Sequence, residues 1–192
     1  MRLFIGIELD EPARTACAAA ARRLRDRLTQ RRVGLDVRWV PEENLHITLW
    51  FLGEVQDAEA TRLSDALQST WQTLPFPITI AGAGAFPPSG PPRILWLGVT
   101  DGAERMRQLY AELAERVEPL GFERERRPYH PHVTIARVKE SNRSAARDAR
   151  SALQTIDAAV SLPVGTVTLF RSRTGSGGAR YEPLLRVPLK EC

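Results

Sequence analysis

Two short segments of the chain, residues 46–49 and 132–135, share the pattern His-x-Thr-x. On a β-strand, His46 and Thr48 would share one face, as would His132 and Thr134, while the apolar residues between them would face the core. Near neutral pH, a histidine can donate or accept a proton, and hydroxyl groups can hold phosphate oxygens. If the two strands face each other, this set of groups suits in-line attack at phosphorus.

The repeated motif is more specific than an isolated histidine. The chain contains three histidines and 13 threonines. On composition alone, the chance that two of the three histidines have a threonine two residues later is about 1%. A single histidine in this pattern is better interpreted as a hydrogen-bonded residue at a strand edge. The matched pair favours catalysis over that structural interpretation.

The surrounding sequence predicts the elements that must position the motifs. Runs of β-branched and aromatic residues predict strands at residues 3–9, 37–40, 45–52, 76–83, 94–99, 132–138, 160–170 and 184–189. Apolar residues spaced by three and four predict helices at residues 11–31, 57–74, 101–120 and 144–156. Proline and glycine predict loops at residues 86–92 and 172–180, the second of which is either a flexible lid or a hairpin turn.

The predicted elements repeat. In each half of the chain, a strand is followed by a long helix and then by a strand that carries the motif. We therefore expect an α+β fold with two pseudo-symmetric lobes, each a mainly antiparallel sheet with helices packed outside, and an active-site cleft between them. Residues 1–192 would form a single domain made of these two lobes.

Composition sets broad limits on the function. The net charge is +4, which tolerates an anionic partner without requiring one. Cys17 and Cys192 lack the spacing of a metal site or a disulfide framework. The apolar segment 3–9 is too short for a signal peptide, and no run is long enough to span a membrane. These features predict a cytoplasmic protein without membrane contact, which we expect to be a monomer.

Five segments resemble a known family, the bacterial RNA 2′,3′-cyclic phosphodiesterases of the 2H phosphoesterase superfamily, which are also described as 2′-5′ RNA ligase-like. The two segments around the motifs, Asn44–Val55 and Pro131–Val138, resemble the family's two motifs, and no motif position departs from them. Residues 93–99 resemble its middle strand, and residues 2–7 and 181–184 also fit. The resemblance therefore covers nearly the whole chain.

The resemblance implies a reaction and roles for individual residues. The reaction is hydrolysis of RNA 2′,3′-cyclic phosphate ends to 2′-phosphate ends. His46 would be the proton donor to the departing 3′-oxygen, and His132 would be the proton acceptor that activates water. Thr48, Thr134 and Arg137 would bind the phosphate, and no cofactor or metal would be needed.

Other residues are candidates for supporting roles. Trp39, Phe51 and Tyr181 are aromatic residues that could stack on a base, although core packing is the alternative for each of them. His130 forms a His-x-His pair with His132, but Pro131 between them disfavours a shared metal site, so we expect His130 at the cleft edge or surface. The charged segment 123–127 is either an approach to the cleft or a solvated loop.

Three alternatives remain open at this point. The same two histidines could run the reverse reaction, in which a 5′-hydroxyl replaces water and RNA ends are joined by a 2′-5′ bond without ATP. A related enzyme of the superfamily could act on a small cyclic nucleotide or on ADP-ribose cyclic phosphate instead of RNA ends. A non-catalytic RNA-end-binding module would keep Arg137 and the aromatic residues but would not need both histidines.

Overall fold

A computed structural model describes residues 1–141, 143–175 and 178–190 of the chain. The α-helices in this part are α1 (Glu11–Gln30), α2 (Asp57–Gln68), α3 (Ala103–Val117) and α4 (Arg143–Leu153), and two short 3₁₀ helices are η1 (Glu42–Asn44) and η2 (Glu118–Leu120). The strands are β1 (Arg2–Glu8), β2 (Leu35–Trp39), β3 (His46–Glu54), β4 (Phe76–Phe86), β5 (Ile94–Val99), β6 (His132–Ser141), β7 (Val160–Val164), β8 (Thr166–Gly175) and β9 (Gly178–Pro188).

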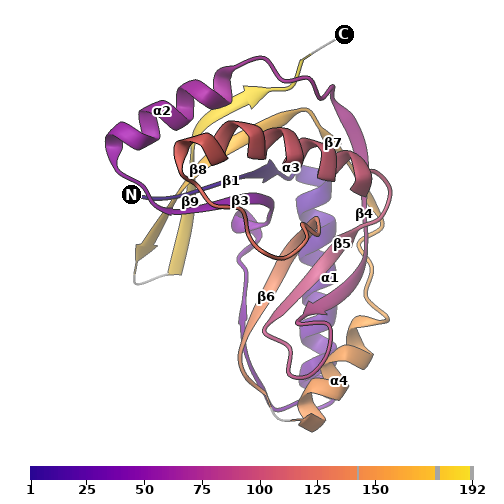
Figure 1. Ribbon diagram of the computed structural model, residues 1–192. Helices are drawn as coiled ribbons and strands as arrows, with labels where there is room; N and C mark the ends of the chain where they lie inside the picture. Colours follow the sequence, from indigo (N-terminus) through magenta and orange to yellow (C-terminus); the bar gives the residue numbers. More distant parts are fainter. Residues whose placement is uncertain (142, 176–177, 191–192) are drawn as a thin grey trace.

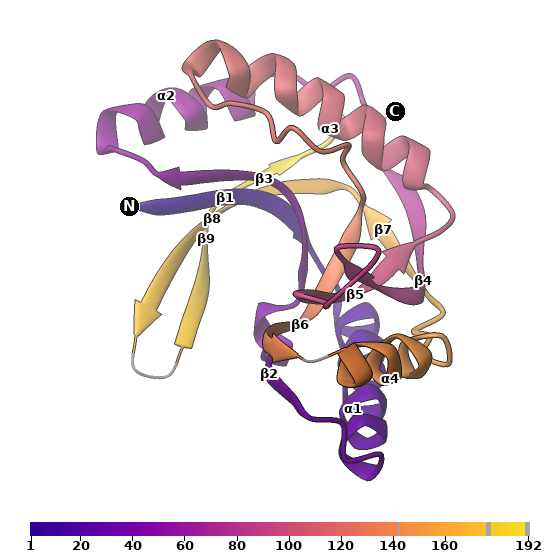
Figure 2. The same ribbon diagram turned by 60° about the horizontal axis from the view of Figure 1, so that its bottom comes forward.

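The nine strands of the described part form one curled sheet in the order β7-β4-β5-β6-β3-β1-β8-β9, and β2 pairs with β6. Every pairing is antiparallel. Helices α2 and α3 lie beside the half that contains β1, β3, β8 and β9, and helices α1 and α4 lie beside the half that contains β4 to β7 (Figures 1 and 2). The predicted α+β class with antiparallel strands is confirmed.

The two halves meet at a single residue pair. Strands β3 and β6 are joined by the pairing of Ile47 with Val133 alone, and both side chains are fully buried. The expected sheets of the two lobes are therefore continuous with each other instead of separate. Because Ile47 and Val133 occupy the same position in their motifs and the strands are antiparallel, a local two-fold axis passes between them. Strand β1, helix α1 and strand β3 of one half correspond to β5, α3 and β6 of the other.

Helix α2 is shorter than predicted. It ends at Gln68, whereas the apolar spacing predicted helix to residue 74. Beyond the helix, Glu112 of α3 accepts hydrogen bonds from the backbone N–H groups of Gln72 and Thr73 at 2.7 and 3.0 Å, and these bonds replace helical ones. Trp71 is nevertheless buried in the core, as its place in the apolar pattern indicates.

The last strands also differ from the prediction. The run 160–170 is two strands, because the chain turns at Gly165 between β7 and β8. Strands β8 and β9 then extend through most of the segment 172–180 that was predicted as a loop, so its described part belongs to a β-hairpin. Residues 176–177 of that segment lie outside the described residues, as does Cys192. Cys17 is fully buried, and burial raises the pKa of its thiol to about 12.

The close approach of β1 to β3 requires a glycine at position 6. A Cβ atom at Gly6 would lie 2.6 Å from the backbone oxygen of Ile47, at the point where β3 holds the first motif. We expect the Gly6→Ala variant to lose about 1–3 kcal/mol of unfolding free energy, because backbone must shift to relieve the overlap. Urea denaturation would measure this loss. The matched control is Gly34→Ala, where a Cβ would meet nothing within 4 Å and stability should not fall; equal losses would contradict the prediction.

Candidate active site

The register of β3 and β6 brings the two motifs together. Extending the Ile47–Val133 pair by one residue in each direction sets His46 opposite Thr134 and Thr48 opposite His132. All four side chains therefore lie on one face of the sheet, opposite the core face occupied by Ile47 and Val133. Two imidazoles and two hydroxyls face a common site, as the spacing of the motifs predicts.

The ring of His46 is fixed at both nitrogens. Its Nδ1 lies 2.8 Å from the backbone oxygen of Asn44, and its Nε2 lies 2.9 Å from Oγ1 of Thr48. Because a carbonyl oxygen only accepts hydrogen bonds, Nδ1 carries a proton and donates it to Asn44. In the neutral ring, Nε2 then accepts a hydrogen bond from the Thr48 hydroxyl.

The ring of His132 is oriented in the same way. Its Nδ1 lies 2.7 Å from the backbone oxygen of His130, which is again the carbonyl two residues earlier. This bond assigns the Nδ1 proton and leaves Nε2 as the nitrogen available for chemistry. Within the described part of the chain, neither Nε2 of His132 nor the Thr134 hydroxyl has a hydrogen-bond partner, so both remain available to a ligand.

Aromatic side chains enclose His46. The ring of Phe4 lies 4.8 Å from the His46 ring between centroids, and Tyr181 stands edge-on to it at 5.2 Å. This burial is the main reason that the pKa of His46 is lowered to about 4, and the charges of His132 and Arg137 add to the effect. The hydrogen bond to the Asn44 carbonyl opposes it. In the free protein, His46 is therefore a neutral imidazole at pH 7.

The pKa of His132 is also lowered. Burial is the largest cause, and the nearby His130 and Arg137 act in the same direction, while the hydrogen bond to the His130 carbonyl opposes them. Neutral His132 can accept a proton at Nε2. The free site thus holds two neutral imidazoles beside cationic Arg137, a combination that suits an anion.

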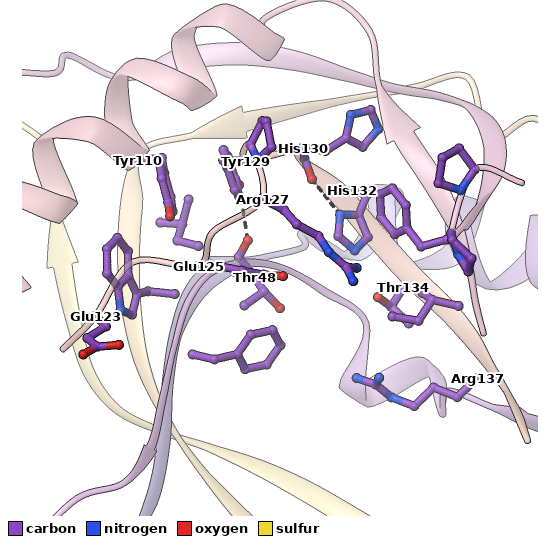
Figure 3. Close-up of a pocket in the computed structure, with 18 residues that line it drawn as sticks. Thr48, Tyr110, Glu123, Glu125, Arg127, Tyr129, His130, His132, Thr134 and Arg137 are labelled. Atoms are coloured by element: carbon purple, nitrogen blue, oxygen red, sulfur yellow. Dashed lines mark hydrogen bonds between the residues drawn. The ribbon is translucent and has the colours of Figure 1, made fainter. Parts of the chain in front are cut away.

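A cavity of about 780 Å³ opens beside the motifs (Figure 3). Thr48, His132, Thr134 and Arg137 line it, and so does Phe51, whose side chain is 62% exposed. The remaining lining residues come mainly from the loop before β6, from the loop after β4, and from β3 and α3.

The residues predicted to support the site differ in their position relative to the cavity. Tyr181 packs edge-on against His46 but is not among the residues that line the cavity. Trp39 packs against the hydrophobic core instead of facing the cleft. His130 is exposed and lines the cavity, which places it at the cleft edge as expected. In the charged segment 123–127, Arg124 pairs with Glu118 on the surface, whereas Arg127 lines the cavity.

A β-bulge turns Arg137 into the site. In a regular strand, Arg137 would face away from Thr134, which is three residues earlier. Strand β5 pairs Trp96 with Thr134 and Leu95 with Ala136, so Ile135 is an extra residue on β6. Ile135 and Ala136 are consecutively buried as a result, and Arg137 returns to the cleft face. The resemblance implied that Arg137 lies near the phosphate, and the bulge is the local reason that it faces the cleft.

Sequence reasoning missed three contributors to the site. Phe4 buries His46, the Asn44 carbonyl orients it, and Tyr129 donates a hydrogen bond to the backbone oxygen of Thr48 at 3.2 Å. A backbone carbonyl leaves no side-chain signal. Asn44 lies two residues before His46, and Tyr129 lies three residues before His132. This proximity in sequence is the signal that could have indicated their roles.

In the described ranges, no three histidine, cysteine, aspartate or glutamate side chains are grouped so that they could hold a metal ion. The described helices include none that is long and apolar enough to cross a membrane.

The curled antiparallel sheet and the two neighbouring His-x-Thr-x strands agree with the resemblance to the 2H phosphoesterases. A family model described as the 2′-5′ RNA ligase superfamily matches residues 12–176. The chain therefore belongs to the 2′-5′ RNA ligase superfamily.

Individual relatives agree with this assignment. A Methanothermobacter thermautotrophicus protein named RNA 2′,3′-cyclic phosphodiesterase is 34% identical over 94% of this chain and 95% of its own length. A protein of the same name from Aeropyrum pernix is 39% identical, over 61% of this chain and 65% of that protein, slightly less than two thirds of its length. The crystal structure of Escherichia coli LigT complexed with 3′-AMP matches with a TM-score of 0.72 and 29% identity, over 98% of this chain and 97% of that one.

Proposed function

We propose that this protein hydrolyses RNA 2′,3′-cyclic phosphate ends to 2′-phosphate ends, with His46 as general acid and His132 as general base. The observation that carries the proposal is the matched orientation of the two rings. Each donates its Nδ1 proton to the carbonyl two residues earlier, at 2.8 Å for His46 and 2.7 Å for His132, which leaves both Nε2 atoms on one face. The names of the relatives support the substrate class.

The proposed step moves two protons and exchanges one phosphorus–oxygen bond. Nε2 of neutral His132 takes a proton from water as the water oxygen bonds to phosphorus. The bond from phosphorus to the ribose 3′-oxygen breaks, and His46 gives its Nε2 proton to that oxygen. Solvent exchange then returns the proton lost by His46 and removes the one gained by His132. Thr48, Thr134 and Arg137 would hold the non-bridging oxygens.

His46 needs a bound anion to act as the acid. Its pKa is lowered to about 4 in the free protein, so the ring must gain a proton when the substrate binds. A phosphodiester carries a negative charge, and a negative charge close to an imidazole raises the pKa of the imidazole. Binding of the substrate would thus lead His46 to take up a proton from solvent.

The cavity supports a nucleotide ligand. Phe51 is 62% exposed on its wall, which leaves the ring free to stack on a base. The 3′-AMP complex of the E. coli relative supports this ligand class. The proposal includes action as a monomer, in the cytoplasm, on RNA ends or small cyclic nucleotides.

The test is incubation with a short RNA that ends in a 2′,3′-cyclic phosphate, followed by chromatography against 2′- and 3′-phosphate standards. We expect the wild type to yield the 2′-phosphate end, with a rate that added EDTA does not change. A second incubation with a 5′-hydroxyl RNA would reveal joining instead. Tight binding without turnover, unchanged in the His46→Ala and His132→Ala variants, would overturn the proposal in favour of an RNA-end-binding module.

A further inference from the structure

Two arginines face each other beside the active site. Strand β2 pairs with β6 so that Arg38 stands directly opposite Arg137, and opposed residues of an antiparallel pair share one face. That face is the one on which the bulge places Arg137, together with His132 and Thr134. Like charges in this arrangement repel each other and lower stability. A neighbouring pair on the same strands is complementary, since Lys139 lies 3.5 Å from a carboxylate oxygen of Asp36.

Neither guanidinium is neutralised by a side chain that the structure describes. Among the side chains that the structure describes, Arg38 and Arg137 have no carboxylate partner and no hydrogen-bond acceptor. Other exposed arginines do form ion pairs, among them Arg22 with Glu42 and Arg173 with Glu182. Two adjacent unpaired guanidinium groups offer forked donors that fit the oxygens of a phosphate.

The guanidinium of Arg38 lies against the β8–β9 hairpin. A Cβ atom at Gly178 would lie 2.8 Å from Nη2 of Arg38, so only a glycine lets the guanidinium lie there. The amide of Asn44 donates a hydrogen bond of 2.7 Å to the backbone oxygen of Ala179, which fixes the hairpin beside the chain that leads into β3. Arg38 thus stands beside Arg137 but outside the set of residues that line the cavity.

We propose that Arg38, together with Arg137, binds the internucleotide phosphate that precedes the reacting end of an RNA chain, while Arg137 also contacts the reacting phosphate. This inference rests on the proposed function and names the substrate more closely. A cyclic mononucleotide has one phosphate, which the histidines, the threonines and Arg137 hold. An RNA end has a second phosphate one nucleotide upstream, and this anion relieves the repulsion between the two arginines. The protein would then select RNA ends over cyclic mononucleotides.

Binding of two product-like ligands tests the proposal by calorimetry. Adenosine 2′-phosphate has only the terminal phosphate, and adenylyl-3′,5′-adenosine 2′-phosphate adds one internucleotide phosphate. We expect the wild type to bind the dinucleotide at least about tenfold more tightly, as suits a charge-assisted contact. Arg38→Ala should remove most of this preference by weakening the dinucleotide alone. Dinucleotide binding by this variant should also depend less on salt. The slope of log Kd against log salt concentration should fall by about 0.7, the value for one phosphate of a single strand.

Two further variants distinguish the effect of the planar guanidinium of Arg38 from that of positive charge in general. Arg38→Lys keeps the charge but loses the planar fork, and it should fall between the wild type and Arg38→Ala. Arg180→Ala is the matched control, because Arg180 is exposed on the same hairpin yet stands opposite Arg173, on the face away from Tyr181. We expect Arg180→Ala to bind both ligands as the wild type does.

Stability provides a readout that a structural role would not give. Because Arg38→Ala relieves repulsion with Arg137, its thermal midpoint should stay level or rise. Equal weakening of both ligands, no weakening of either, or the same loss in Arg180→Ala would overturn the proposal. Turnover of the two corresponding 2′,3′-cyclic phosphates is measured separately. If neither is hydrolysed, the proposed function fails, while the ratio of dissociation constants still decides the role of Arg38.

Discussion

His132→Ala is expected to lower kcat for cyclic phosphate hydrolysis by about 10²- to 10⁴-fold, the usual contribution of a positioned acid or base. His132 lines the cavity, and its Nε2 is free because Nδ1 is bonded to the His130 carbonyl. Without this imidazole, water must lose its proton to solvent. Single-turnover rates with a fluorescent RNA that ends in a cyclic phosphate would measure the loss, and circular dichroism would verify the fold.

The neighbouring histidine supplies a matched control. His130 lines the same cavity, but it orients His132 through its backbone carbonyl, which His130→Ala preserves. We expect less than about a tenfold loss for this variant. The His46→Ala/His132→Ala double variant should be little slower than either single variant, since the pair acts as a unit. A loss in His130→Ala as large as in His132→Ala would contradict the assigned roles.

Anion binding is expected to draw a proton onto His46. In the free protein, burial holds the pKa of His46 at about 4, so its ring should show no titration between pH 5 and pH 8 by NMR. An anion at the site binds the protonated form more strongly, and by linkage it must raise the pKa of His46. We expect an increase of at least about one unit with saturating sulfate, which keeps its charge across this range.

The same linkage fixes the sign of the affinity change. Sulfate should bind more tightly as the pH falls from 8 towards 5, because each bound anion takes up protons at the histidines. In His46→Gln, this pH dependence should become shallower, since only His132 remains to titrate. A wild-type affinity that is flat or weakens towards low pH would show that the anion is not held beside these rings.

Folding stability should follow the opposite direction. A histidine whose pKa is lowered in the folded state binds fewer protons there than in the unfolded chain, where the pKa is about 6.5. The unfolding free energy contributed by neutral His46 is therefore fully present above pH 6.5, and it is lost as the pH falls towards 4. Acid conditions thus favour anion binding, while they lower the unfolding free energy of the protein without a bound anion.

The sequence reveals the chemistry of this site better than its three-dimensional support. Alternation on a strand was enough to place His46 with Thr48, and His132 with Thr134, on a common face. It could not place Arg137, because simple alternation sends that side chain to the wrong face and the bulge at Ile135 depends on how β5 pairs with β6. Register between distant strands is a property of the folded sheet and is not written in local spacing.

Two other features that the local pattern does not reveal have the same origin. Helix α2 ends early because Glu112, far along the chain, supplies acceptors for the backbone of Gln72 and Thr73. The two predicted lobes share one sheet because of a single long-range pair, Ile47 with Val133. In each case a tertiary contact overrides a local preference, so local pattern alone could not have shown it.

The local two-fold axis at Ile47 and Val133 has a consequence for stereochemical choice. A phosphate on that axis meets an imidazole on either side, so the backbone alone does not distinguish the ribose 2′-oxygen from the 3′-oxygen as the leaving group. The distinction must come from the unequal walls, an aromatic enclosure around His46 and an open cavity beside His132. Regioselectivity is therefore set by the side chains that break the symmetry. Substitution of Phe4 or Tyr181 would alter which phosphate isomer forms, although both histidines remain in place.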